Sequence, residues 1–327
     1  TLVGDNAGGA ITTGGNNVAV GSGALLVATT AADNTAVGTL ALTANSSGTD
    51  NTAVGYAAGD AVTTGSNNTF VGDNSGGATT TADNNTAVGA SALLVNSTGA
   101  ANVAVGKSAL AANTTASNNT AVGLNSLLVN TTGADNVAVG YAALDANTTA
   151  SENTAVGSSS LSTNSTGAEN VAVGYSALSN ATTASYNTAV GKSSLGSNTT
   201  GANNTAVGKS ALAANIDGAE NSAVGAEALD ANTTGAENVA LGYGALSANT
   251  TASYNTSVGK SSMGSNSTGA NNTAVGKSAL AANTTANNNT AVGYVSATAN
   301  TTGAGNVSVG ESSLKTNTEG DNNVGVG

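Results

Sequence analysis

Residues 119–135 read NTAVGLNSLLVNTTGAD and residues 136–152 read NVAVGYAALDANTTASE, and this 17-residue unit decides the fold. Every seventeenth residue from Gly4 to Gly327 is a glycine, so no insertion or deletion interrupts the repeat. An ordinary globular domain absorbs length changes in its loops, whereas a strict period requires each unit to occupy the same geometric step. The repeat therefore predicts a stack of equivalent coils.

The composition excludes a conventional core. Only 7% of the residues are charged and 2% are aromatic, whereas roughly a quarter of the residues in a typical globular domain are charged. Abundant Gly, Asn, Thr, Ala and Ser would also suit a disordered low-complexity segment. The regular recurrence of Val and Leu favours order instead.

The charged residues exclude several classes of function. The net charge of -12 provides no basic groove for nucleic acid and disfavours anionic membrane surfaces. No run of 18 apolar residues is present, so we expect no insertion into a membrane. Without His, Cys or Arg, a row of equivalent residues cannot build a singular catalytic site. We therefore predict that the chain is not an enzyme, with no catalytic, cofactor-binding or metal-binding residues and no cofactor.

Counting from the asparagine, position 1 is Asn in every unit from Asn17 to Asn323. Asparagine side chains stacked in register can donate to one neighbour and accept from the next. A structural ladder is the first interpretation, and a ligand-binding row of amides is the alternative.

Positions 2 and 4 are the β-branched residues of the strand, Thr or Val followed by Val. Side chains two apart on a strand share one face, so we expect positions 2 and 4 to face the coil interior. Position 3 would then face outward, and its small side chains predict contact between subunits or else a plain surface of short side chains. The residues behind this prediction are Ala36, Ala104, Ala155, Ala206, Ala274, Ser257 and Ser308, with Phe70 as the exception.

Two further positions predict internal geometry. Position 5 is the invariant Gly, which suits a backbone with positive φ or close packing. Position 9 is usually Leu and predicts a second internal ladder, which is interrupted at Gly8, Gly59, Gly76 and Ala297. We expect a thinner core or a narrower coil near the first three of these. Positions 12 to 14, usually Asn-Thr-Thr, predict a corner between two short extended segments.

Positions 6 and 17 vary most and are predicted to be exposed. Position 6 carries most of the lysines and tyrosines, namely Lys107, Lys192, Lys209, Lys260, Lys277, Tyr56, Tyr141, Tyr175, Tyr243 and Tyr294. Position 17 holds Asp33, Asp50, Asp135, Glu152, Glu169, Glu220 and Glu237. Stacked like charges weaken pairing unless a cation screens them, so a row of divalent ions is one interpretation. A solubilising surface is the other.

A longer period overlies the repeat. From Gly99 to Gly201, position 15 alternates between Gly and Ala, and residues 174–215 recur almost verbatim as residues 242–283. This pattern indicates duplication of whole units, as expected for a spacer of adjustable length.

Together these patterns predict an all-β parallel β-solenoid over residues 1–327, a single continuous domain of about 19 coils. At about 4.8 Å per coil it would span on the order of 90 Å. The chain starts and stops within a repeat, so we expect it to be a piece of a longer fibrous protein.

The NTAVG, NVAVG and NTSVG segments, each followed by a small-residue SAL segment, resemble the YadA-like head repeats of trimeric autotransporter adhesins. Similar TAVG repeats occur in phage tail-fibre-like proteins. The resemblance covers the whole chain and implies a left-handed β-roll, three chains side by side, at a cell surface or a virion appendage. The head repeats are usually shorter than 17 residues, and this chain shows no neck, heptads or anchor.

The leading hypothesis is a structural and adhesive fibre segment, extracellular or on a virion, that acts as a rigid spacer. Its expected partners are copies of itself, as a trimer or filament through the small Ala row, and a host or surface receptor. Two alternatives stay open. One is a self-assembling extracellular filament subunit, since both ends expose unpaired strand edges. The other is an ice- or crystal-surface-binding solenoid, against which stands the expectation that the position 2 threonines face inward.

Overall fold

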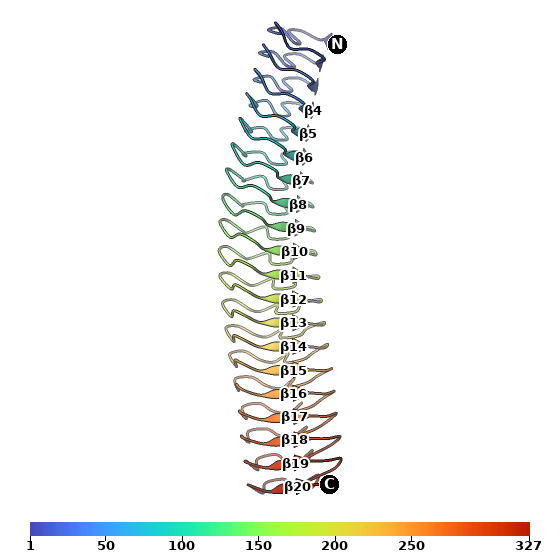
Figure 1. Cartoon of the computed structure of the whole chain (residues 1–327), viewed down its shortest axis with the longest axis vertical. Helices are drawn as coiled ribbons and strands as arrows, with labels where there is room; N and C mark the ends of the chain where they lie inside the picture. The colour runs from blue at the N-terminus through green and yellow to red at the C-terminus, as the bar shows by residue number, and fades with distance from the viewer. The chain divides into compact units, whose positions relative to one another are not determined.

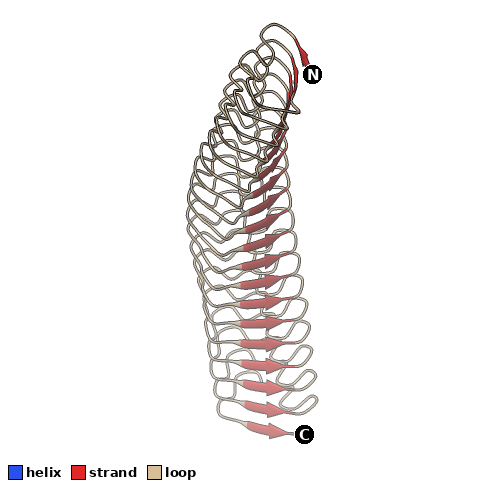
Figure 2. Cartoon of the chain, turned by 45° about the horizontal axis from the view of Figure 1, so that its top comes forward, coloured by secondary structure: helices blue, strands red, loops and turns tan.

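The computed structural model describes all residues 1–327 and is an all-β parallel β-solenoid with 17 residues per coil, which confirms the predicted fold class (Figures 1 and 2). No helix long and apolar enough to cross a membrane is present. Each coil contributes one short strand. The strands are β1 (Leu2–Val3), β2 (Val18–Val20), β3 (Thr35–Val37), β4 (Thr52–Val54), β5 (Thr69–Val71), β6 (Thr86–Val88), β7 (Val103–Val105), β8 (Thr120–Val122), β9 (Val137–Val139), β10 (Thr154–Val156), β11 (Val171–Val173), β12 (Thr188–Val190), β13 (Thr205–Val207), β14 (Ser222–Val224), β15 (Val239–Leu241), β16 (Thr256–Val258), β17 (Thr273–Val275), β18 (Thr290–Val292), β19 (Val307–Val309) and β20 (Val324–Val326).

The coils form two compact units, Thr1–Thr166 with β1 to β10 and Gly167–Gly327 with β11 to β20. Within each unit every strand pairs in parallel with the strand one repeat later, without any shift of register. Ala121 of β8 lies opposite Ala138 of β9, and Ala189 of β12 lies opposite Ala206 of β13. The constant 17-residue offset brings equivalent side chains together in columns.

The expected second extended segment is absent, because positions 6 to 11 form turns. Positions 7 and 9 adopt the left-handed conformation, with φ of 56° at Ser108 and 51° at Leu110. A strand cannot continue through such residues, because its φ is strongly negative. Glu227, at position 7 of another coil, likewise has a φ of 58°. Each coil therefore has a single strand, and the leucines enter the interior from a turn.

The orientation predicted for the strand was wrong by one residue. Positions 1 and 3 face the interior: Asn119 and Ala121 are fully buried, as are their counterparts in most coils. Positions 2 and 4 face outward, so Thr120 and Val122 are only half-buried. The reason is volume, because the large side chain at position 9 fills the coil and leaves room for only a small side chain, Ala or Ser, opposite it. The Ala row therefore cannot mediate contact between subunits.

The gaps in the Leu column at Gly8, Gly59 and Gly76 are filled from position 3, so the core is not thinned there as expected. Phe70, fully buried, packs against Gly59 and Gly76, where two leucines are missing. Leu2 likewise packs against Gly8. Large residues at position 3 thus accompany small residues at position 9, as expected for a close-packed interior.

The Asn ladder at position 1 is confirmed. The Asn136 amide nitrogen Nδ2 donates to Oδ1 of Asn119 at 3.1 Å and to the carbonyl of Ala150 at 2.9 Å. Its Oδ1 accepts from the backbone N–H of Asn153 at 3.0 Å. Buried amides are tolerated when they are hydrogen-bonded in this way, and no donor remains for a ligand. The amide row is structural.

Position 12 forms a second buried ladder. Asn130 donates from Nδ2 to Oδ1 of Asn113 at 3.2 Å and to the carbonyl of Gly133 at 2.9 Å. Next to it the position 13 hydroxyls reach along the stack, and Thr131 Oγ1 donates to the Thr148 carbonyl at 2.9 Å. These bonds hold the predicted corner.

Where position 15 alternates between Gly and Ala, the position 16 residues of successive coils are joined by a hydrogen bond from a backbone N–H to a serine side chain. The backbone N–H of Ala100, which follows Gly99, donates to Oγ of Ser117 at 3.0 Å. The N–H of Ala134 makes the same bond to Ser151. A coil with Gly-Ala at positions 15 and 16 thus donates a hydrogen bond to the serine of the next coil, which has Ala-Ser at these positions. This bond gives a physical basis to the alternation, which repeats every two coils.

Candidate binding surface

The variable side chains lie outside, as predicted for positions 6 and 17. Exposed fractions of the position 6 tyrosines are 55% at Tyr141, 59% at Tyr175 and 53% at Tyr243. Position 17 is exposed at acidic residues such as Asp135, whose backbone is left-handed with φ of 58°. Both positions lie beside the outward Thr and Val of the strand.

Lysines and tyrosines of neighbouring coils pair along position 6. The Nζ atom lies 5.8 Å from the ring centroid in the pair Lys192–Tyr175, and 5.6 Å in the pair Lys260–Tyr243. A third such pair is Lys277 with Tyr294, at 5.5 Å. Cation–π attraction between exposed side chains is weak, so these pairs are only slightly favourable.

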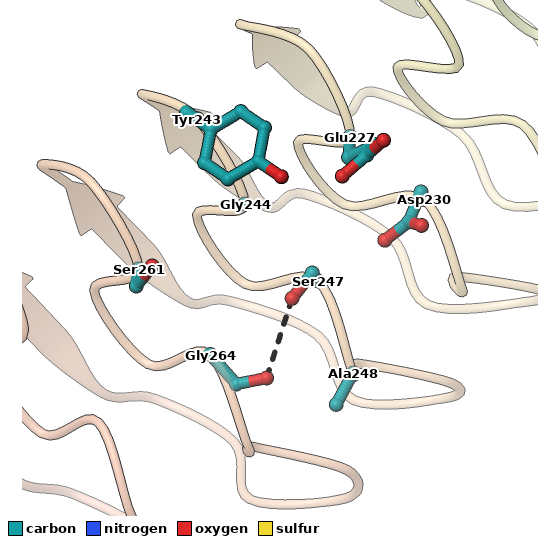
Figure 3. Close-up of a pocket in the computed structure, with 8 residues that line it drawn as sticks. All are labelled: Glu227, Asp230, Tyr243, Gly244, Ser247, Ala248, Ser261 and Gly264. Carbon is teal, nitrogen blue, oxygen red and sulfur yellow. Dashed lines mark hydrogen bonds between the residues drawn. The ribbon is translucent and has the colours of Figure 1, made fainter.

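A hollow of about 420 Å³ opens on this surface within the second unit (Figure 3). It spans three coils and is built from positions 6, 7, 10 and 11, so no strand residue contributes to it. Its lining consists of Glu227, Asp230, Tyr243, Gly244, Ser247, Ala248, Ser261 and Gly264.

Two glycines create the hollow. Gly244 stands at position 7 and Gly264 at position 10, where other coils carry side chains such as Leu40 and Leu128. A β-carbon at Gly244 would meet nothing closer than Ser261 Oγ at 3.9 Å. The space is therefore left open by the absence of side chains and not by a distortion of the coil.

Charges of both signs surround the hollow. Glu227 Oε1 lies 3.9 Å from Lys209 Nζ, on the coil before it. The Glu227 carboxylate raises the pKa of Tyr243 through a hydrogen bond and through charge repulsion. Burial raises the pKa of Asp230, against hydrogen bonds from its own backbone N–H and that of Ala231, and the charge of Glu227 raises it further. In Figure 3 the Tyr243 hydroxyl and the Glu227 carboxylate lie on the same side of the hollow.

No group of three or more His, Cys, Asp or Glu residues is arranged so that it could hold a metal ion. Glu220 and Glu237, on successive coils, stand as a charged row.

Sequence reasoning predicted no binding residues and missed the hollow. Its signal was present in the repeat, because Glu227 and Gly244 occupy position 7 in successive coils where Ser is common. The sequence shows that these two residues depart from the repeat. It does not show that the departure opens a hollow, because that depends on the conformation of the turn.

Models of known protein families give no match to this chain, and none of the curated proteins is significantly similar to it.

Proposed function

We propose that the chain is a structural and adhesive segment of an extracellular or virion fibre, in which stacked coils act as a rigid spacer and copies associate side by side. The observation that carries this proposal is the outward face of the strands. Within each unit, positions 2 and 4 present only Thr, Val, Ser or Leu to solvent, without a single charge.

This Thr/Val face has the properties of an interface. Val224 is 38% exposed and Leu241 is 47% exposed, so apolar surface lies open on successive coils. Charged and polar residues at positions 6 and 17 border the face, which matches the apolar centre and polar rim of protein interfaces. Extended apolar patches of this kind mark interaction sites in soluble proteins.

A second copy of the chain is the partner that fits best. Identical coils in register present identical rows, and the absence of charge on positions 2 and 4 removes like-charge repulsion between copies. The face thus takes over the role that the sequence had assigned to the Ala row. The trimer implied by the family resemblance is one assembly compatible with such a face.

Analytical ultracentrifugation of the purified chain tests this assembly. We expect an oligomer that is lost when Val207→Lys and Val224→Lys are combined. A matched control, Thr200→Lys with Thr234→Lys, adds the same charge at exposed corner positions and should leave the oligomer intact. A monomer at every concentration would contradict side-by-side association. Immunogold labelling of intact cells or virions tests the location.

One observation also favours the ice- or crystal-binding alternative. The threonines of position 2 face outward and repeat in register, as at Thr188 and Thr205, which removes the earlier objection that they point inward. A flat array of Thr and Val methyl groups at strand spacing can match a lattice. Thermal hysteresis of the purified chain, abolished by Val207→Lys with Val224→Lys, would support this function over association of copies.

A further inference from the structure

We propose that the hollow at Tyr243 is a subsite for one neutral hexose unit of a glycan. This goes beyond the fibre assignment and does not depend on it, because the hollow is built from the turn positions 6 to 11 and not from the Thr/Val face.

The lining offers the groups that bind a sugar. The Tyr243 ring is more than half exposed and provides an apolar surface for the C–H face of a pyranose. The carboxylates of Glu227 and Asp230 can accept hydrogen bonds from sugar hydroxyls. The Ser261 hydroxyl can donate or accept, and the Ser247 hydroxyl, which donates to the Gly264 carbonyl, can accept. A few convergent polar groups beside an aromatic ring are typical of small-molecule sites.

The charge balance favours a neutral ligand. Glu227 and Asp230 are matched by Lys209, 3.9 Å from Glu227, and by Lys260, which lies over the Tyr243 ring. An organic cation would compete with two ammonium groups already in place. An anion would approach two carboxylates. A polyhydroxylated neutral ring meets neither obstacle.

The space suits one sugar ring with the rest of a glycan outside. About 420 Å³ falls in the range of small-molecule sites, and the hollow lies open at Tyr243. The side chain of Ser247 is held by a 3.4 Å hydrogen bond to the carbonyl of Gly264, which fixes one wall (Figure 3).

The near-duplicate segment provides an internal control. Residues 174–215 repeat as 242–283, so Tyr175 corresponds to Tyr243 and also holds a lysine over its ring. In that copy Ser176 replaces Gly244. Tyr175 is therefore the control for substitutions at Tyr243, and Ser176 is the control for substitutions at Gly244, because each pair occupies the same position of the repeat.

Saturation-transfer NMR and titration of the full chain test the proposal, with the methyl glycosides of glucose, galactose and mannose as neutral probes. Choline and N-acetylneuraminic acid serve as cationic and anionic counter-probes. We expect at least one neutral glycoside to bind with a Kd of about 1 mM, as suits a single subsite. Affinity should fall at least about tenfold in Tyr243→Ala and in Gly244→Leu, a loss of about 1.4 kcal/mol.

Gly244→Leu fills the hollow without disturbing the coil, because Leu40 occupies the same position with φ of 62°. Circular dichroism confirms folding of each variant, and Tyr175→Ala and Ser176→Leu should bind like the unsubstituted chain. The proposal is overturned if no neutral glycoside binds or if only a charged probe binds. It is equally overturned if folded Gly244→Leu retains full affinity.

Discussion

The ring of Phe70 occupies the space that a side chain at Gly59 would need: a β-carbon at Gly59 would lie 2.6 Å from Phe70 Cδ2. Gly76, one coil further on, is in the same relation to the other edge of the ring. One aromatic residue at position 3 thus replaces two leucines at position 9. The exchange shows that positions 3 and 9 share one interior volume.

This shared volume predicts a coupled set of substitutions. Phe70→Ala should destabilise the first unit by about 3–5 kcal/mol, because it leaves a cavity beside two glycines. Adding Gly59→Leu and Gly76→Leu should restore much of that loss, since the coils would then match their neighbours. Gly76→Leu alone should destabilise through overpacking. Denaturant midpoints measure all four chains, and purely additive effects would contradict the shared volume.

The Asn ladder should tolerate no change of its donor. Asn136→Asp removes the two hydrogen bonds from Nδ2 and places a buried charge beside Asn119 Oδ1. We expect a loss of at least about 1–3 kcal/mol, the cost of leaving buried polar groups unpaired. Asn118→Asp is the matched control, because it makes the same chemical change at exposed position 17, where Asp33 and Asp135 occur. Equal thermal midpoints for the two variants would refute the structural role of the ladder.

The invariant glycine is required because of contact with the next coil. At Gly140, φ is 135° and a β-carbon would lie 2.6 Å from the carbonyl oxygen of Gly157. Gly140→Ala should therefore lower the free energy of unfolding by more than about 1–3 kcal/mol, which is the cost of the strained backbone conformation alone. Gly264→Ala is the control, because its nearest contact would be an ordinary 3.5 Å and Ala occupies this position in other coils. Thermal unfolding measures the stability of both variants. If Gly140→Ala were as stable as Gly264→Ala, Gly140 would not need to be a glycine for its contact with Gly157.

Acidification should stabilise the chain through Asp145. Burial raises its pKa above the usual value of 3.8, despite hydrogen bonds from its own N–H and that of Ala146. A folded state that holds the proton more tightly gains stability below the unfolded pKa and loses it as the pH rises through the folded pKa. The thermal midpoint should therefore increase as the pH falls from 7 towards 4.

Asp145→Asn should raise the midpoint at pH 7 and weaken its dependence on pH. Asp135→Asn, at an exposed position, controls for the loss of one negative charge. If both variants keep the same pH profile, burial of Asp145 does not contribute to the dependence.

The sequence predicted the period, the parallel solenoid, the Asn ladder, the glycine geometry and the exposed positions. It misplaced the strand faces, because the larger β-branched Thr and Val side chains were assigned to the interior and the small Ala side chains to the surface. The pairing of Phe70 with Gly59 and Gly76 was visible and could have corrected this. Left-handed leucines such as Leu110 could not be foreseen, since a bulky residue rarely adopts a positive φ.

The hollow depends on that same unforeseen turn. Only the stacking of coils brings Gly244 and Gly264 beside Glu227 and Tyr243, so their positions in the sequence did not predict a hollow. The period alone predicts that equivalent side chains stack in columns. A hollow between two columns can be predicted only when the conformation of the turn is known.

Oxidative cross-linking tests the central claim, association through the Thr/Val face, most directly. The chain has no cysteine, so Leu241→Cys places a single thiol on that face and Thr234→Cys places one at an exposed corner. At low protein concentration we predict a covalent dimer for Leu241→Cys and none for Thr234→Cys. A monomeric Leu241→Cys chain, or equal cross-linking of both variants, would contradict the account.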